Sequence, residues 1–379
     1  MIAQRVEVKR HAGALLHVCF KASPVIANPR YSVHFHRRLP TLANLGFNSP
    51  REALMKSVKS KNHSLPVETP HPREARLAGG VSPLIRPLVE LAETAANSGR
   101  FVLEAEEVEA LKLEHGVSED ELMLSLLDRA QEMARPPISK FHVGAVGLGV
   151  SGRMLLGVNI ELHGMPLHHA VHAEQFVIAN AVRVGEARLL RIAVSAMPCG
   201  HCRQFMTELP GVEELQITVL GGPPHRLAQL LPHRFGPEDL LPAGVGPRLL
   251  GRHDHGLKLT PGALDQLPEG LARTAIAALH HANQSYTPYS ASPAGLALQC
   301  VSGSIHAGGV IESCAYNPTM NPLHTALVAA TAQGMKSWDH IEHAVLVERP
   351  SSNVLHGKMY QLILEELSPG CQLHVLHAV

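Results

Sequence analysis

Apolar positions recur every three or four residues between Leu122 and Met133, which is the spacing of one helical face. Ser118 and Glu121 form a capping-box pattern just before this run, so the helix should begin there. Pro136, the first of two consecutive prolines, should end it. The pattern therefore predicts an amphipathic core helix between these two signals.

Short apolar runs of strand type follow, and helices are expected between the later ones. The predicted strands cover residues 142–150, 153–160, 190–196 and 215–220. A Ser-Gly pair at 151–152 is typical of a hairpin turn between the first two strands. Strands that alternate with helices predict an α/β fold, here a three-layer sandwich.

The same pattern returns 151 residues further along the chain. Residues 282–290 correspond to 131–139, and the strands expected over 294–301 and 304–311 again flank a Ser-Gly pair. One offset that holds through a helix end, two strands and a turn indicates an internal duplication. We therefore expect two units of the same fold.

Basic residues are concentrated near the start of the chain. Residues 1–70 contain 11 Lys or Arg and 3 Glu, whereas the other 309 residues contain 22 Lys or Arg and 30 Asp or Glu. The acidic remainder argues against a nucleic-acid partner, because phosphate binding draws on clusters of Lys and Arg. It favours a small neutral substrate. No apolar run approaches the ~18 residues that span a bilayer, so no membrane partner is expected.

These patterns divide the chain into a basic N-terminal extension (1–80), a helical segment (81–117), a first unit (118–220), a connecting segment rich in Pro and Gly (221–264) and a second unit (265–379). The extension is typical of an organellar transit peptide, while a solvated disordered tail or a gene-model artefact is an equal alternative. The expected location is the cytoplasm, or an organelle if the extension is a transit peptide. Of the six cysteines only Cys199 and Cys202 lie close together, which indicates a reducing compartment.

One combination of residues carries the strongest chemical signal. His172 and Glu174 form a His-x-Glu pair, and Cys199, which follows a proline, lies 27 residues after the histidine and opens a Cys-x-x-Cys motif with Cys202. One imidazole and two thiolates supply three zinc ligands and leave a fourth position for water, which is the pattern of a catalytic site. Glu174 lies two residues from a ligand, so it is expected to move protons as the general acid and base. This order of residues is typical of zinc deaminases.

This part of the chain resembles the cytidine deaminase family, in particular its two-domain type known from enterobacteria and plants. The resemblance runs from about residue 118 to the C-terminus and rests on residues 139–145, 157–161, 172–174, 198–205 and 232–237. It implies two three-layer α/β/α units, each with a mixed sheet flanked by helices, the second being a degenerate repeat of the first. It also implies a hydrolase with one Zn²⁺ per chain that deaminates cytidine and deoxycytidine in pyrimidine salvage.

The resemblance further implies contacts to a nucleoside substrate. Asn159 and Glu161 should hydrogen-bond the ribose 3'-hydroxyl, and Phe141 should pack on the pyrimidine ring. Ala173 should line the substrate site, and Phe235 should form a second aromatic wall. Without the resemblance, Asn159 and Glu161 would fit a solvated strand end equally well, and Phe141 would more often be a core residue.

The second unit has no zinc ligands at the positions that the repeat gives. Asn321-Pro322-Leu323 takes the place of the His-x-Glu box, and the offset of 151 residues puts Pro350 and Asn353 opposite the two cysteines. One zinc ion per chain is therefore expected. In the resembled family two-repeat chains form homodimers, so a homodimer is expected here, with the partner's second unit closing the catalytic site.

Two other functions stay open. A deaminase acting on RNA, DNA or a nucleotide would use the same zinc motif, but it would need a Lys and Arg surface or a phosphate clamp, and the acidic body lacks the first. A non-catalytic zinc scaffold would have no need of an acid such as Glu174 beside the metal.

Overall fold

Helix α5 (Glu119–Met133) begins where the sequence predicts it. In the computed structural model, which describes residues 100–246 and 248–379, Ser118 is the N-cap of this helix. The Ser118 amide donates to Glu121 Oε2 at 2.8 Å, and the Glu121 amide donates back to Ser118 Oγ at 3.3 Å. The apolar face of the helix is buried. The predicted extension, residues 1–80, and the first part of the helical segment, residues 81–99, lie outside the described residues.

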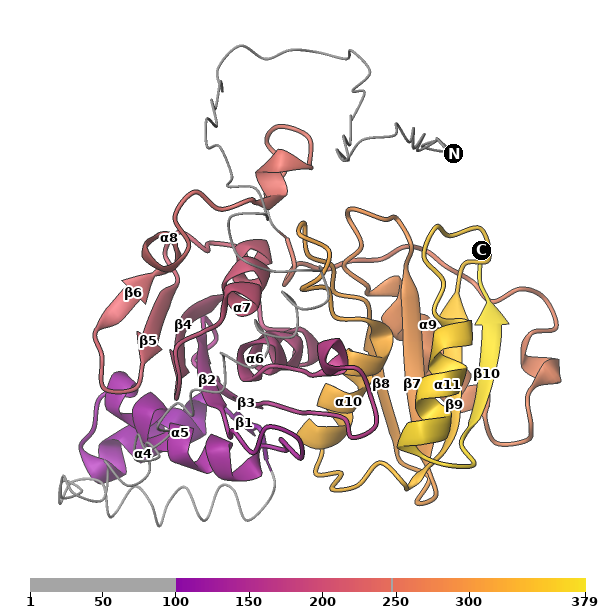
Figure 1. Ribbon diagram of the computed structural model, residues 1–379, viewed down its shortest axis with the longest axis horizontal. Helices are drawn as coiled ribbons and strands as arrows, with labels where there is room; N and C mark the ends of the chain where they lie inside the picture. Colours follow the sequence, from indigo (N-terminus) through magenta and orange to yellow (C-terminus); the bar gives the residue numbers. More distant parts are fainter. Residues whose placement is uncertain (1–99, 247) are drawn as a thin grey trace, which may run out of the picture. The chain divides into compact units, whose positions relative to one another are not determined.

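The first unit is built on a six-stranded sheet with the order β1-β3-β2-β4-β5-β6 (Figure 1). Strands β4 and β5 pair in parallel and the other neighbours antiparallel, so the sheet is mixed. The strands are β1 (Val102–Leu103), β2 (Gly144–Gly149), β3 (Met154–Val158), β4 (Leu189–Val194), β5 (Gln216–Val219) and β6 (Pro224–Arg226). The sequence predicts β2 to β5. It does not predict β1, or β6, which lies in the segment expected to serve as a connection.

Helices cover both faces of this sheet. Gly144 and Gly147 of β2 face opposite sides, as their spacing along a strand requires. A Cβ on Gly144 would lie 2.6 Å from Leu127 O of α5, and a Cβ on Gly147 would lie 2.6 Å from Val177 Cγ1 of α6 (Ala173–Arg183). Both helices therefore approach the sheet so closely that only glycine fits at these positions, and three layers result. Helix α4 (Ala105–His115) precedes α5.

The second unit repeats this arrangement on a four-stranded sheet with the order β10-β9-β7-β8, in which β9 and β10 are parallel. Gly295, 151 residues after Gly144, packs against α9 (Ala272–Asn283) as Gly144 packs against α5. The other elements are β7 (Ala294–Cys300), β8 (Ile305–Gly309), α10 (Pro322–Ala332), β9 (Ile341–Glu348), α11 (Gly357–Leu367) and β10 (Gln372–His377). The predicted fold of two α/β units is confirmed.

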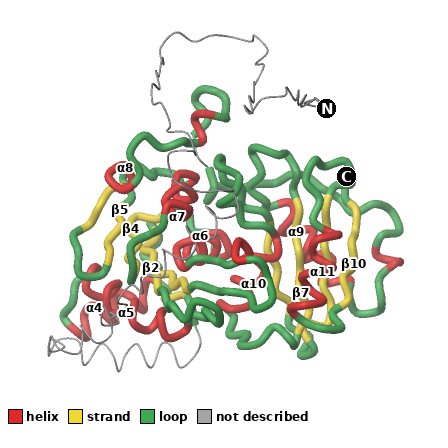
Figure 2. The backbone as a smooth tube through the Cα atoms, viewed as in Figure 1, coloured by secondary structure: helices red, strands yellow, loops and turns green. Residues whose placement is uncertain are grey.

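Helices α6 and α10 lie side by side between the two sheets (Figure 1). Residues 231–246 and 248–262, which follow the short helix α8 (Leu227–Leu230), connect the two units and are mostly loop (Figure 2). Within the described residues, no helix is long and apolar enough to cross a membrane.

Candidate metal centre and active site

Two helix N-termini bring the predicted metal ligands together. His172 is the N-cap of α6, and Cys199 is the N-cap of the short helix α7 (Gly200–Phe205), whose third residue is Cys202. Nδ1 of His172 lies 3.4 Å from Cys199 Sγ and 3.3 Å from Cys202 Sγ. Among the described residues, these three side chains are the group whose ligand atoms could hold a metal ion, since all lie within 4.8 Å of one another.

The spacing and chemistry of this group fit zinc. Zn–S bonds of about 2.3 Å and Zn–N bonds of about 2.0 Å at tetrahedral angles place nitrogen and sulfur ligands about 3.5 Å apart. The observed separations of 3.3 and 3.4 Å need only a small adjustment to reach this value. Soft thiolates with one imidazole are ligands that zinc prefers, and three protein ligands leave a coordination position for water or substrate.

The electrostatic environment favours an ionised sulfur at the start of α7. A hydrogen bond from Cys202 lowers the pKa of the Cys199 thiol to about 3 against the opposing effect of burial, and His172 acts in the same direction. The same hydrogen bond, together with burial, raises the pKa of Cys202. Free amides at a helix N-terminus stabilise a thiolate further. Cys199 is therefore ready to ligate as a thiolate, and the charge of a bound cation would favour the same form of Cys202.

Glu174 lies in the first turn of α6, one residue beyond the fully buried Ala173, and is itself 4% exposed. Burial raises the pKa of this carboxyl, although a backbone hydrogen bond and His172 partly oppose the shift. A carboxyl with a raised pKa can take up and release a proton closer to neutral pH than an exposed one. The side chain thus has the surroundings of a proton carrier beside the metal ligands.

Asn159 and Glu161 brace the loop that carries Phe141. Oε2 of Glu161 accepts from the amides of Ile138 and Ser139, both at 2.9 Å, and the Ser139 hydroxyl donates to Oε1. Oδ1 of Asn159 accepts from Val143 N, and its Nδ2 donates to Phe141 O, again both at 2.9 Å. Each side chain keeps hydrogen-bonding capacity for a further partner, since an amide carries two donors and a carboxylate about four acceptor sites.

Phe141 is 51% exposed, so this residue is not part of the core. Burial works against ionisation of Glu161, but the hydrogen bonds from Ser139 and Ile138 outweigh it and lower the pKa of the carboxyl. Glu161 is therefore a fixed carboxylate that holds the loop in place at neutral pH.

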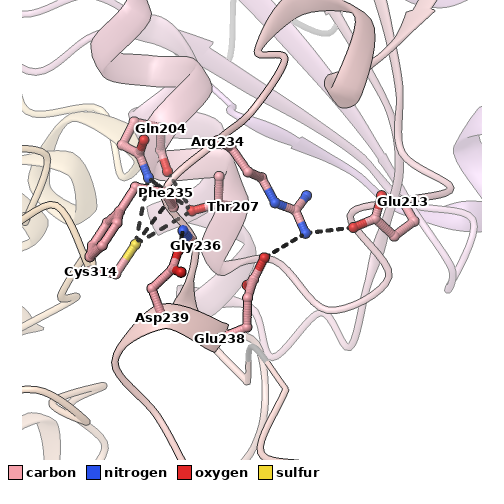
Figure 3. Close-up of polar contacts among 9 residues, drawn as sticks. All are labelled: Gln204, Thr207, Glu213, Arg234, Phe235, Gly236, Glu238, Asp239 and Cys314. Carbon is pink, nitrogen blue, oxygen red and sulfur yellow. Dashed lines mark hydrogen bonds and ion pairs between the residues drawn. The ribbon is translucent and has the colours of Figure 1, made fainter. Parts of the chain in front are cut away.

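Phe235 lies in a segment that is fastened to α7 (Figure 3). Its carbonyl accepts from Gln204 Nε2 at 2.6 Å and from Cys314 Sγ at 3.7 Å. The next residue, Gly236, donates its amide to Asp239 Oδ2 at 2.7 Å. Arg234 pairs with Glu213 and Glu238 at 2.5 and 3.4 Å. Phe235 is 45% exposed, and its role as an aromatic wall stays a prediction.

The second unit contacts the first beside the metal ligands, which the sequence did not reveal. Nε2 of His201 lies 3.1 Å from Asn317 O, and Gln175 Nε2 donates to Pro318 O at 3.0 Å. Glu208, in the turn Met206–Glu208 directly after α7, is fully buried. It accepts hydrogen bonds from Tyr286 OH at 2.9 Å, Tyr289 OH at 2.7 Å and Cys314 N at 2.7 Å. In the sequence, Glu208 is a single acidic residue shortly after the Cys-x-x-Cys motif. No local pattern there indicates that its partners lie in the second unit.

In the second unit, hydrogen bonds within the chain occupy the position that corresponds to the metal centre. Asn321 is the N-cap of α10, where α6 has His172, and its Oδ1 accepts from Leu323 N, His324 N and Tyr360 OH at 2.9–3.1 Å. Within residues 265–379, all of which are described, no group that could hold a metal is found.

The predicted equivalence of Pro350 with Cys199 is wrong. The connection from β9 to α11 is longer than that from β4 to α7, and the N-cap of α11 is His356. Insertions in a surface connection cost little free energy. A residue offset taken from the strands therefore no longer holds after such an insertion.

Comparisons with known proteins agree with this geometry. Residues 117–218 and 227–361 each match a family model described as the cytidine and deoxycytidylate deaminase zinc-binding region. "Cytidine deaminase 1" of Arabidopsis thaliana is 43% identical over 300 residues, covering 73% of this chain and 97% of the relative. The chain belongs to the cytidine deaminase family. A second relative, "Cytidine deaminase 6" of Arabidopsis thaliana, is 40% identical over 277 residues, with 70% of this chain and 94% of the relative covered.

Among solved structures, a crystal structure of cytidine deaminase from Mycobacterium tuberculosis shares 33% identity, with 32% of this chain and 99% of that chain covered at a TM-score of 0.29. The second family-model match begins at residue 227 and so includes α8 and the loops before α9. The two matched regions lie in the two α/β units of this member of the cytidine deaminase family. The His172, Cys199 and Cys202 group lies in the first matched region, residues 117–218.

Proposed function

We propose that this chain catalyses the hydrolytic deamination of cytidine and 2'-deoxycytidine to uridine and 2'-deoxyuridine with release of ammonia, in pyrimidine salvage. The observation that carries the proposal is the buried Glu174 next to a His172, Cys199 and Cys202 group whose spacing fits zinc. Membership of the cytidine deaminase family supports the pyrimidine nucleoside as substrate.

His172, Cys199 and Cys202 would hold one zinc ion, which supplies Lewis-acid chemistry that brings the pKa of a water molecule toward neutrality. Glu174 accepts a proton from that water and delivers it to N3 of the pyrimidine, so that C4 becomes electrophilic enough for the oxygen to add. Glu174 then takes the remaining proton from the hydroxyl added at C4 and passes it to the 4-amino group. The C4–N bond breaks, ammonia leaves, and the added oxygen remains as the carbonyl of uridine.

The other predicted residues position the nucleoside. We assign the ribose 3'-hydroxyl to the remaining hydrogen-bonding capacity of Asn159 and Glu161, and the pyrimidine ring to the exposed face of Phe141. Ala173, which has no side chain beyond Cβ, lies in the chain between the ligand His172 and the proton carrier Glu174, and we assign it to the site of the base. Phe235 forms the second wall. The rigid bracing of the 138–143 loop supports this assignment, because a fixed loop loses little entropy on binding.

The test follows the fall in ultraviolet absorbance when purified protein meets cytidine, deoxycytidine and the 5'-monophosphate of each, with zinc measured on the same sample. Turnover of both nucleosides at about one zinc per chain is the expected result. Turnover of the monophosphates alone, or zinc without any nucleoside turnover, would overturn the proposal.

We also propose that the chain works as a homodimer in the cytoplasm and that residues 118–220 and 265–379 are its two domains. The contact of residues 317 and 318 with α6 and α7 supports a second domain that is needed beside the site. Light scattering during size-exclusion chromatography measures the mass of the active species. A fully active monomer would contradict the homodimer.

A further inference from the structure

A cleft that the deamination chemistry does not use lies at the junction of the two units. It encloses about 560 Å³ between the end of α6, helix α9, strand β8 and the end of α10. A narrow extension leads inward to Leu249 and Tyr286. The catalytic groups lie at the other end of α6, which is 11 residues or about 16 Å long. The cleft is therefore separate from the metal centre.

Basic and neutral polar side chains line this cleft, and no Asp or Glu does. They are Arg183, Arg273, His280, His281, Gln284 and Gln333. Burial lowers the pKa of His281 to about 4, so its imidazole is neutral at pH 7 and offers a donor rather than a charge. The positive charge of the cleft thus comes from its two arginines, in a chain whose described part is acidic overall.

Arg183 is the better placed of the two arginines. Its side chain is half-buried, and Nε donates to Asn180 Oδ1 at 2.9 Å. Asn180 is itself fully buried and is fixed by donating to Phe101 O at 2.9 Å and Leu156 O at 3.3 Å. Among the described residues, the two terminal nitrogens of Arg183 have no hydrogen-bond or ion-pair partner. Burial accordingly lowers the pKa of Arg183.

The duplication provides an internal comparison. At the equivalent junction, where the end of α5 meets the end of α10, the guanidinium of Arg135 donates to Met335 O and lies 5.2 Å from the ring centre of Trp338. There one terminal nitrogen of the arginine is bound by a carbonyl and the guanidinium lies against an aromatic face, while its Nη1 is buried without a hydrogen-bond partner. At the end of α6, Nε of Arg183 holds the guanidinium in place through Asn180, and the two terminal nitrogens remain available to a ligand.

Helix dipoles oppose an anion here, but weakly. Helices α6, α9 and α10 all end at the cleft, and a helix C-terminus carries about half a negative charge. Their last carbonyls are capped by amides that follow each helix: Gly185 N to Val182 O at 3.1 Å, Gln284 N to His280 O at 3.0 Å and Gly334 N to Thr331 O at 3.0 Å. Capped partial charges are outweighed by two full guanidinium charges with no carboxylate beside them.

We propose that this cleft is a second ligand site, which binds a phosphate-bearing small molecule of nucleotide size. The planar fork of Arg183, with Arg273 opposite on α9, matches the geometry of a phosphate group. Apolar lining by Val182, Ala277 and Ile305 offers a surface for the nucleoside part. The volume lies within the roughly 300–1,000 Å³ of small-molecule sites.

Equilibrium binding to the zinc-loaded full-length protein tests the site, with inorganic phosphate and uridine 5'-monophosphate as probes. Arg183→Gln and Arg273→Gln remove the charges that line the cleft. Arg153→Gln is the matched control, because Arg153 pairs with Glu104 at the surface and does not line the cleft. Circular dichroism melting shows whether each variant folds, and Arg273 is exposed, so its loss does not disturb the core.

We expect uridine monophosphate to bind more tightly than inorganic phosphate, and each cleft variant to weaken it at least tenfold, which corresponds to about 1.4 kcal/mol. The Arg153 variant should bind like the wild type. Equal affinity of all three variants and the wild type would place the probe elsewhere and overturn the proposal. So would the absence of binding at millimolar probe, while equal binding of the two probes would reduce the site to one for free phosphate and remove the nucleotide from it.

Discussion

Glu208 is the side chain whose removal should most weaken the junction between the two units. It is fully buried and is the common acceptor for Tyr286 OH, Tyr289 OH and Cys314 N, which lie 78, 81 and 106 residues further along the chain. Glu208→Ala would leave these three donors in a buried space without a partner. Each lost partner costs about 1–3 kcal/mol, and water entering the cavity recovers part of this. We expect a loss of about 3–5 kcal/mol in the free energy of unfolding.

Urea unfolding of the zinc-loaded protein, followed by circular dichroism, measures this loss. Tyr289→Phe removes a single hydrogen bond to the carboxyl and should cost about 1.5–3 kcal/mol. Glu132→Ala is the matched control, because Glu132 is an exposed helix residue whose ion pair with Arg129 is worth less than about 1 kcal/mol. A Glu208→Ala variant as stable as the Glu132→Ala control would refute the reasoning.

Three further predictions concern the same chain. Glu174→Gln should retain zinc and lose at least about 10²–10⁴-fold in kcat, because an amide cannot carry the proton; appreciable turnover of that variant would contradict the assignment. Chelation of zinc should lower the Tm, since a metal that binds the native state at 1,000 times its Kd adds about 4 kcal/mol of stability; only added zinc, and not magnesium, should restore the Tm in a melting experiment. Burial raises the pKa of Glu208, so the folded state holds its proton more tightly than the unfolded state. The stability that wild type has over Glu208→Gln should therefore be greatest below about pH 4 and should fall as pH rises toward the folded pKa, and a difference that is constant from pH 4 to 8 would speak against this.

Local signals in the sequence were sufficient for the elements that carry the chemistry. Ser118 and Glu121 fixed the start of α5 because both partners of a capping box lie within one turn. His172 and Cys199 each precede a helix, so their positions at two helix N-termini followed from the helix pattern on either side. The predicted repeat offset of 151 residues holds at Gly295, which packs against α9 as Gly144 packs against α5, because the connection from the helix end to the strand has the same length in both units.

What the sequence by itself determined is therefore the α/β fold, the duplication and the motif of His172, Cys199 and Cys202. The elements and the motif are encoded in spacings of a few to about thirty residues, and the duplication in one constant offset of 151 residues. Only the tertiary structure decided which side chains meet across the units: Glu208 with Tyr286 and Tyr289, His201 with residue 317, and the two arginines of the cleft. It also decided that α11 begins at Gly357, after a longer connection. Such contacts join residues about 80 to 120 positions apart, and they arise from the packing of one finished unit on another, which no local pattern of polar and apolar residues encodes.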